Sequence, residues 1–295
     1  MEKKKKMSRA DIIFHVIAIA IFALFAFVCV YPFYYMLICS FSDNQLVSLG
    51  RITLFPKGIH LGNYTTIFKA PNIMNATITS VARTIIGTGG TLLVTAYMAY
   101  FYTKQEMFCR KFFYRYTVIT MYFSAGMIPI YLNNTKLGLT NTFWIYIIPG
   151  LLSVYNMILI KTSIEGLPAE LEESAMLDGA GYFTRFIRIV LPLQKPILAT
   201  VGLFSAVHHW NDFFTTKLYV TEPKIYTLQF QLYELLNQVR ALADAASGDE
   251  HSLQAVKPAG IRMALTAVVV FPIICVYPFI QKFYIKGIMI GAVKG

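Results

Sequence analysis

Residues 170–192 read ELEESAMLDGAGYFTRFIRIVLP, and this stretch decides how the rest of the chain is interpreted. It begins with a polar, acidic segment and separates two long apolar runs of the sequence. Charged side chains of this kind are costly to place in lipid. The stretch must therefore be solvated or held by another protein.

The composition is that of a membrane protein. Of 295 residues, 56% are hydrophobic and 14% are charged, and the mean hydropathy is +0.56. Soluble domains carry about 25% charged residues, and runs of about 18 or more apolar residues indicate helices that span a bilayer. We predict an all-α membrane protein with six such helices, at residues 12–39, 76–102, 112–132, 142–161, 195–217 and 262–285.

The basic residues predict the orientation of these spans. Sixteen of the 26 Lys and Arg residues lie in segments 1–11, 103–115, 161–195 and 282–295, and nine lie in the longer set 42–75, 133–141 and 217–262. An excess of Lys and Arg marks the cytoplasmic side of a membrane, so we expect both termini in the cytosol. The net charge of +11 is then a topology signal and argues against nucleic-acid binding.

Two regions follow from this arrangement. We assign residues 1–74 to an N-terminal anchor helix with a first outer loop, and residues 75–290 to a transmembrane core with a cytosolic loop at 162–192. The first apolar run follows Lys3 to Lys6 and is too long for the core of a signal peptide, so we expect it to stay as an anchor. The four cysteines show no CxxC spacing, and we expect no disulfide or metal framework.

Local signals in the acidic stretch predict two short helices joined by a bend. Pro168 suits the first position of a helix, and this helix can run to Asp178, where Gly179 supplies the left-handed conformation of a helix stop. A second helix at about 182–190 carries aromatic and basic side chains. The pair would present an exposed apolar ridge with charged edges, and a partner protein is the simplest reason for such a surface.

The spacing in this stretch resembles the motif of ABC importer permeases: Glu-Ala-Ala, three residues, Gly, nine residues, Ile, one residue, Leu-Pro. The motif is matched in register, with Ser174 in place of the second Ala. The resemblance implies a type I ABC importer permease in which this loop is the coupling helix, seated in a cleft of a cytosolic ATPase. Polar contacts to the ATPase would come from Glu173, and the bend from Gly179. The residues assigned to ATPase coupling are Glu173, Ser174, Ala175, Asp178, Gly179, Ala180, Ile189, Leu191 and Pro192.

Other stretches resemble the carbohydrate branch of the same family, in particular its maltose-type and oligosaccharide permeases. These are residues 55–58 with 63–64, 210–213, 277–282 and the tail 286–295. The resemblance covers nearly the whole chain. It implies a multi-pass sugar permease of the bacterial inner membrane, with a second permease subunit, an ABC ATPase dimer and an extracytoplasmic solute-binding protein as partners.

The sequence contains no GxxxxGK[ST] phosphate-binding motif. ATP would therefore be bound by a separate subunit, and we expect no cofactor, no metal site and no covalent chemistry in this chain. His208 and Asp212 share a helical face, but two ligands do not make a metal site.

The outer end of the fifth predicted span carries a candidate substrate path. Trp210 could stack on a sugar ring while Asn211 and Asp212 bond its hydroxyl groups, although an interfacial Trp is the common alternative. Arg83 lies roughly 10 Å from the outer end of the second span at 1.5 Å per residue, a depth similar to that of Asp212. Intramembrane charges are usually paired, so we expect an Arg83–Asp212 ion pair, with snorkelling of Arg83 as the alternative.

Two further patterns predict local packing. Small residues at 87–90 (Gly-Thr-Gly-Gly) allow close approach of a neighbouring helix in lipid. Leu228, Leu232, Leu235 and Leu236 recur at helical spacing, which predicts an amphipathic helix near the outer surface.

Two other functions fit the sequence less well. Half of an ion-coupled secondary transporter usually needs acidic or His residues in mid-membrane, yet Asp212 alone of the 15 acidic residues falls inside a predicted span. A membrane-embedded protease with a Glu-Glu-x-x-x-Arg signature would use Glu172 and Glu173, but Leu177 stands where Arg is required.

Overall fold

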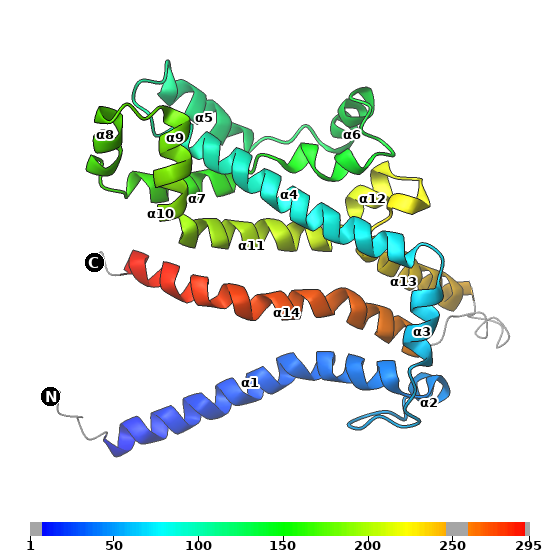
Figure 1. Ribbon diagram of the computed structural model, residues 1–295. Helices are drawn as coiled ribbons and strands as arrows, with labels where there is room; N and C mark the ends of the chain where they lie inside the picture. The colour runs from blue at the N-terminus through cyan, green and yellow to red at the C-terminus, as the bar shows by residue number, and fades with distance from the viewer. Residues whose placement is uncertain (1–7, 246–258, 293–295) are drawn as a thin grey trace. The chain divides into compact units, whose positions relative to one another are not determined.

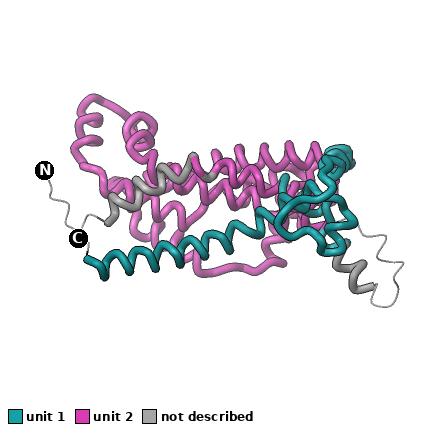
Figure 2. The backbone as a smooth tube through the Cα atoms, turned by 90° about the horizontal axis from the view of Figure 1, so that it is seen from below, with its two compact units in different colours: residues 1–70, 236–268 teal, residues 71–235, 269–295 magenta. Residues whose placement is uncertain are grey.

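The computed structural model describes residues 8–245 and 259–292, and every element in these two ranges is helical (Figure 1). The chain divides into two compact units (Figure 2): unit 1 comprises residues 1–70 and 236–268, and unit 2 comprises residues 71–235 and 269–295. Lys3 to Lys6, and residues 293–295 of the predicted tail, lie outside the described residues.

Unit 1 contains three complete helices: α1 (Arg9–Phe41), α2 (Asn44–Ser48) and α3 (Gly62–Lys69). The most apolar stretch of α1 has no buried residue, whereas its last turn packs with Val47 and Ile52 in a small core. The buried Asn63 side chain donates to the Ser40 carbonyl oxygen at 3.0 Å and ties α3 to the end of α1. The first part of α14 (Ala259–Ala292) contributes Ala259 to the same core.

Unit 2 holds most of the elements. Its helical segments are α4 (Ile73–Phe101), α5 (Arg110–Thr120), α6 (Met127–Lys136), η1 (Phe143–Tyr146), η2 (Ile148–Gly150), α7 (Val154–Glu165), α8 (Glu170–Leu177), α9 (Tyr182–Arg185), the π-helical turn η3 (Phe186–Val190), α10 (Leu191–Leu193), α11 (Lys195–Asn211), α12 (Phe214–Tyr219) and η4 (Pro223–Ile225). The beginning of α13 (Leu228–Ala245) and the later part of α14 complete it.

The core of unit 2 is built from α4, α7 and α11, and α4 runs alongside α11 (Figure 1). The glycine-rich segment of α4 allows this contact, as predicted. A Cβ built on Gly87 would lie 2.6 Å from the His209 ring, and one on Gly90 would lie 2.7 Å from Leu151 Cδ2. A larger residue at either position would therefore force the helix backbone or the neighbouring side chain to move.

The predicted spans are only partly continuous. In the described residues, α1, α4 and Ala259–Val276 of α14 are each long and apolar enough to cross a membrane. Two bent pairs reach that length together: Phe143–Gly150 with Val154–Glu165, at 47°, and Tyr182–Leu193 with Lys195–Asn211, at 85°. Three to five spans follow from length and composition. The count of six, the cytosolic termini and the 1–74 and 75–290 division remain predictions.

The prediction of one continuous helix at 112–132 is wrong. The first helix, α5, ends at Thr120, and α6 begins only at Met127. Gly126 has φ +85°, a left-handed conformation that interrupts a helix, and Pro129 has no N–H to continue the hydrogen-bond ladder upstream. The two features together break the apolar run.

The fifth predicted span, 195–217, also ends early. In the structure α11 stops at Asn211, and Asp212 adopts an extended conformation with φ −78° and ψ 108°. Its carboxylate accepts the Thr215 N–H at 3.1 Å, which starts a separate helix, α12. By contrast, the helix predicted from the leucine spacing is confirmed as α13, with Leu228, Leu232 and Leu235 buried and Leu236 exposed. Its place near the outer surface stays a prediction.

Candidate functional site

The acidic stretch forms the bent helical pair that its sequence predicts, although Pro168 precedes the first helix and is not its first residue. One helix, α8, covers Glu170–Leu177, and the second helical segment runs through α9 and η3 to Val190. At the bend Gly179 has φ +79°, its N–H bonds the Met176 carbonyl oxygen at 3.0 Å, and the Ala180 N–H bonds the Ala175 carbonyl oxygen at 2.9 Å. This pair of bonds is a Schellman motif, which ends a helix with a left-handed residue.

The predicted apolar ridge is exposed in part: Leu171, Phe183 and Ile187 are exposed, whereas Phe186, which was expected on it, is buried. Leu177 is 87% exposed, and Met176, Tyr182 and Phe183 are exposed beside it. The residues assigned to ATPase coupling lie at this surface or at its base: Glu173, Ser174, Asp178, Gly179 and Pro192 are exposed, and Ala175, Ala180, Ile189 and Leu191 are half-buried. The structure therefore keeps them together on one bent element.

A buried amide fixes the base of this element. Gln194 is buried and lies at the 85° bend between α11 and residues 170–193, which we call the coupling stretch after the motif it carries. Its Nε2 donates to the Ser163 carbonyl oxygen at 3.2 Å, and its Oε1 accepts from the Ser163 hydroxyl at 2.5 Å. This reciprocal pair joins the bend to α7. Sequence reasoning missed Gln194, because no local pattern marks a single amide as buried.

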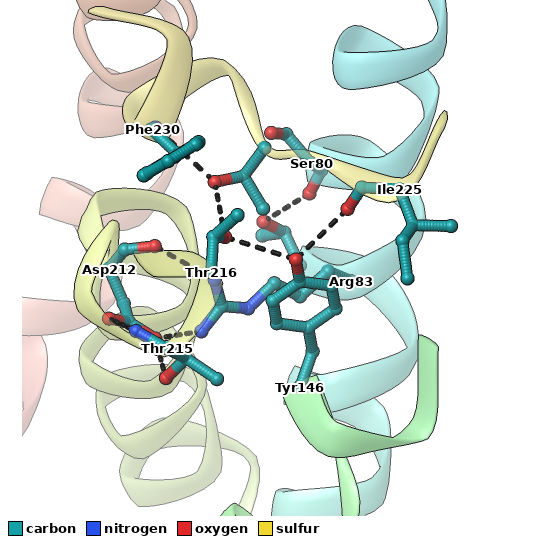
Figure 3. A network of polar contacts seen from close by, with 10 residues as sticks. Ser80, Arg83, Tyr146, Asp212, Thr215, Thr216, Ile225 and Phe230 are labelled. Carbon is teal, nitrogen blue, oxygen red and sulfur yellow. Dashed lines mark hydrogen bonds and ion pairs between the residues drawn. The ribbon is translucent and has the colours of Figure 1, made fainter. Parts of the chain in front are cut away.

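A second polar site lies where α4 meets the end of α11 (Figure 3). The expected pairing is confirmed: the Arg83 guanidinium forms an ion pair with the Asp212 carboxylate and also donates to the Asp212 carbonyl oxygen at 2.9 Å. Arg83 is 2% exposed, so it does not snorkel to an interface. The Thr215 hydroxyl and N–H also donate to the Asp212 carboxylate, at 2.5 Å and 3.1 Å.

A chain of hydroxyl groups continues from this ion pair. The Arg83 guanidinium lies 4.6 Å from the centre of the Tyr146 ring, and the Tyr146 hydroxyl donates to the Ile225 carbonyl oxygen at 2.9 Å. Since that hydroxyl has one hydrogen, it accepts from Thr216 at 3.0 Å, and Thr216 in turn accepts from Thr227 at 3.0 Å. The chain joins η1, α12 and the segment that precedes α13.

One further bond attaches α13 to α4. The Leu228 N–H, at the first residue of α13, donates to the Ser80 hydroxyl at 2.8 Å (Figure 3). Ser80 lies one turn before Arg83 on α4, so both belong to one polar layer that we call the polar network: Ser80, Arg83, Tyr146, Asp212, Thr215, Thr216 and Thr227. Sequence reasoning found two of its members, the charged ones.

The remaining candidate substrate residues differ in their surroundings. Trp210 is buried, and its Nε1–H donates to the Val269 carbonyl oxygen at 2.9 Å. It also lines, with His208 and side chains of α4 and α14, an apolar pocket of about 580 Å³. Asn211 is exposed at the end of α11. Stacking of a sugar on Trp210 therefore stays a prediction.

One acidic residue of the coupling stretch does not face solvent. The Glu172 carboxylate meets Tyr100, at the end of α4, and Lys104, in the segment that follows α4. Sequence reasoning missed this role of Glu172, because nothing in the sequence distinguishes it from the neighbouring Glu170 and Glu173.

The chain matches a family model over most of its length. The model of the inner membrane component of binding-protein-dependent transport systems covers residues 4–289.

Two proteins of Bacillus subtilis (strain 168) are similar in sequence. Protein LplC is 38% identical over 270 residues, which is 91% of this chain and 90% of that protein. The polygalacturonan/rhamnogalacturonan transport system permease protein YtcP is 35% identical over 275 residues, 92% of this chain and 95% of that protein. A solved chain from a bacterial ABC transporter involved in the import of the acidic polysaccharide alginate has a TM-score of 0.85 and 27% identity, covering 95% of this chain and 100% of that one.

Proposed function

Because the chain belongs to the family of inner membrane components of binding-protein-dependent transport systems, we propose that it is the permease subunit of an ATP-driven importer of oligosaccharides. In this role it forms part of the translocation path and carries out no covalent chemistry. It works in the bacterial cytoplasmic membrane with a second permease subunit, two copies of a cytosolic ATPase and an extracytoplasmic binding protein. ATP and any metal it needs are bound by the ATPase.

The exposed bend between α8 and α9 is the observation that carries this proposal. Its motif residues lie on a short, rigid element with an apolar edge, which suits insertion into a cleft of another protein. Closure of the ATPase dimer around ATP would draw this element inward and change the side of the membrane to which the cavity opens. The expected contacts are polar at Glu173 and apolar at Leu177.

The substrate class is an acidic oligosaccharide. YtcP is named for the transport of polygalacturonan and rhamnogalacturonan, and the solved transporter for the import of the acidic polysaccharide alginate; both matches cover more than nine-tenths of this chain. Galacturonate units carry a carboxylate, so both names point to acidic sugars. The exposed Asn211 and the wall formed by Trp210 would belong to the path, with the Arg83–Asp212 pair buried behind them as support.

Reconstitution of the complete transporter in vesicles tests the proposal. We expect uptake of labelled oligogalacturonides when ATP and the binding protein are supplied, and slower uptake of neutral malto-oligosaccharides of equal length. Uptake driven by an ion gradient without ATP would refute the importer. Faster uptake of the neutral sugars would refute the acidic substrate alone.

A further inference from the structure

Glu172 connects the coupling stretch to the membrane core. Its Oε2 accepts a hydrogen bond from the Tyr100 hydroxyl at 3.0 Å and forms an ion pair with Lys104 Nζ at 2.5 Å. Arg185, on α9, places its Nη1 3.8 Å from the same oxygen. One carboxylate therefore joins α8 to the end of α4 and to α9.

The partners of this carboxylate are held in fixed positions. Tyr100 is 1% exposed, and the Lys104 ammonium lies 4.0 Å from the centre of its ring. Arg185 is buried, and its guanidinium lies 4.5 Å from the centre of the Tyr182 ring. Exposed ion pairs contribute little because water screens them, whereas a half-buried carboxylate with several charged donors makes stronger hydrogen bonds.

The neighbouring carboxylates differ. Glu170 and Glu173 are exposed, and among the hydrogen bonds and ion pairs of residues 8–245 and 259–292, only Glu172 bonds an α8 side chain to another element. Glu165, on α7, pairs with Lys161 within the same helix. Glu172 thus has a role that its neighbours do not share.

We propose that Glu172 is a positioning residue that fastens α8 to the cytosolic end of α4, so that movement of the coupling helix is passed to the core of the permease. This proposal rests on the proposed function, because it assigns a route to the movement that the ATPase imposes. Without the carboxylate, α8 would stay attached to the ATPase but would move against α4 instead of with it.

The test compares Glu172→Gln with Glu165→Gln in the reconstituted transporter. We measure three quantities: the amount of assembled complex, its ATP hydrolysis, and uptake of a labelled mixture of oligogalacturonides and malto-oligosaccharides. For Glu172→Gln we expect assembly and ATP hydrolysis within about twofold of the wild type and an uptake per ATP about tenfold lower. Glu165→Gln, which removes the same charge from a pair inside one helix, should leave uptake per ATP unchanged.

A milder variant tests the same bond. Tyr100→Phe keeps the buried ring and removes only the hydroxyl that donates to Glu172, so uptake per ATP should fall about threefold. Glu172→Ala removes the acceptor of this bond altogether, so Tyr100→Phe should cause no further fall in uptake per ATP when it is added to Glu172→Ala. If Glu172→Gln fails to assemble, Tyr100→Phe decides the question by itself.

Either of two results overturns the proposal: unchanged uptake per ATP in these variants, or an equal fall in Glu165→Gln. In both cases the wild-type transporter still imports sugar. If the wild type shows no ATP-driven uptake, the proposed function fails instead.

Discussion

His209 occupies the space that a side chain at position 87 would need. The imidazole is 4% exposed, and its Cε1 and Nε2 atoms lie 2.6 Å from the place of a Cβ on Gly87. We expect Gly87→Ala to destabilise the protein by about 1–3 kcal/mol, because the ring has little room to move away. A lower melting temperature of the purified protein in detergent would show this.

A nearby glycine provides the matched control. Gly89 lies on the same helix, and a Cβ there meets no atom within 4 Å. Ala favours a helix over Gly by about 1 kcal/mol, so Gly89→Ala should keep or raise the melting temperature. An equal loss in both variants would show that the close contact with His209 is unimportant.

The Arg83–Asp212 pair gives a second prediction at the scale of single residues. Loss of one partner leaves a buried charge unpaired, at a cost of about 3–5 kcal/mol. We expect Arg83→Asp and Asp212→Arg each to abolish uptake and reduce the amount of folded protein. The double variant should recover part of the uptake and part of the folded protein. Recovery should be incomplete, because the swap cannot restore the bond from Arg83 to the Asp212 carbonyl oxygen. No recovery in the double variant would show that loss of the ion pair is not the cause of the defects in the single variants.

Among the helical elements, α8 depends on the left-handed residue that ends it. Gly179 adopts this conformation with φ +79°. Most other L-residues pay about 1–2 kcal/mol there; Asp pays less, but it adds a charged side chain at the bend that we propose enters the ATPase. We expect Gly179→Asp to abolish uptake while the protein still inserts into the membrane, since the change lies at an exposed bend. Uptake assays and a membrane-fraction blot measure the two effects.

Gly181 serves as the control for this element. It has φ −68°, which any residue can adopt, and a Cβ there meets no atom within 4 Å. Gly181→Ala should therefore transport normally. Normal uptake in Gly179→Asp would contradict the coupling role of the bend.

Sequence reasoning predicted the elements that are determined by residues close to one another in the chain. The bend at Gly179 and the helix from Leu228 follow from residues within a few positions, and both are confirmed. The Arg83–Asp212 pair could also be predicted, because two charges in apolar runs must find a partner.

Other features depend on partners that are distant in sequence. Tyr100 and Glu172 are 72 positions apart, and Tyr146 and Ile225 are 79 apart. Such pairs follow only from the tertiary packing of α4 with α8 and of η1 with η4. The break between α5 and α6 was missed because hydropathy cannot distinguish a continuous apolar helix from an apolar run interrupted at Gly126.

On the scale of unit 2, α4 joins the two polar sites. It has 29 residues, and it is therefore about 44 Å long, more than the roughly 30 Å of a bilayer core. Arg83 in the polar network and Tyr100 beside Glu172 are about 26 Å apart along its axis. A single rigid helix can thus connect the coupling stretch to the candidate substrate path.

We expect α8 and η4 to lie on opposite sides of the membrane. Between them in the chain runs the bent pair that ends in α11, which is long and apolar enough to cross once. Single cysteines at two exposed positions, Ser174→Cys and Lys224→Cys, should therefore be labelled by an impermeant maleimide from opposite faces. The exposed native Cys29, Cys109 and Cys275 are first replaced by Ser.

The positive-inside rule decides which face is which. Segment 161–195 was assigned to the cytosol from its basic residues, so Ser174→Cys should react in inside-out vesicles and Lys224→Cys in intact, right-side-out vesicles. The variant with these three replacements and no added cysteine, which keeps only buried Cys39, is the blank for both preparations. If both cysteines react from the same face, α11 does not cross the membrane. If each reacts from the face opposite to that expected, the crossing stands, but the coupling stretch faces away from any cytosolic ATPase and cannot be its docking site.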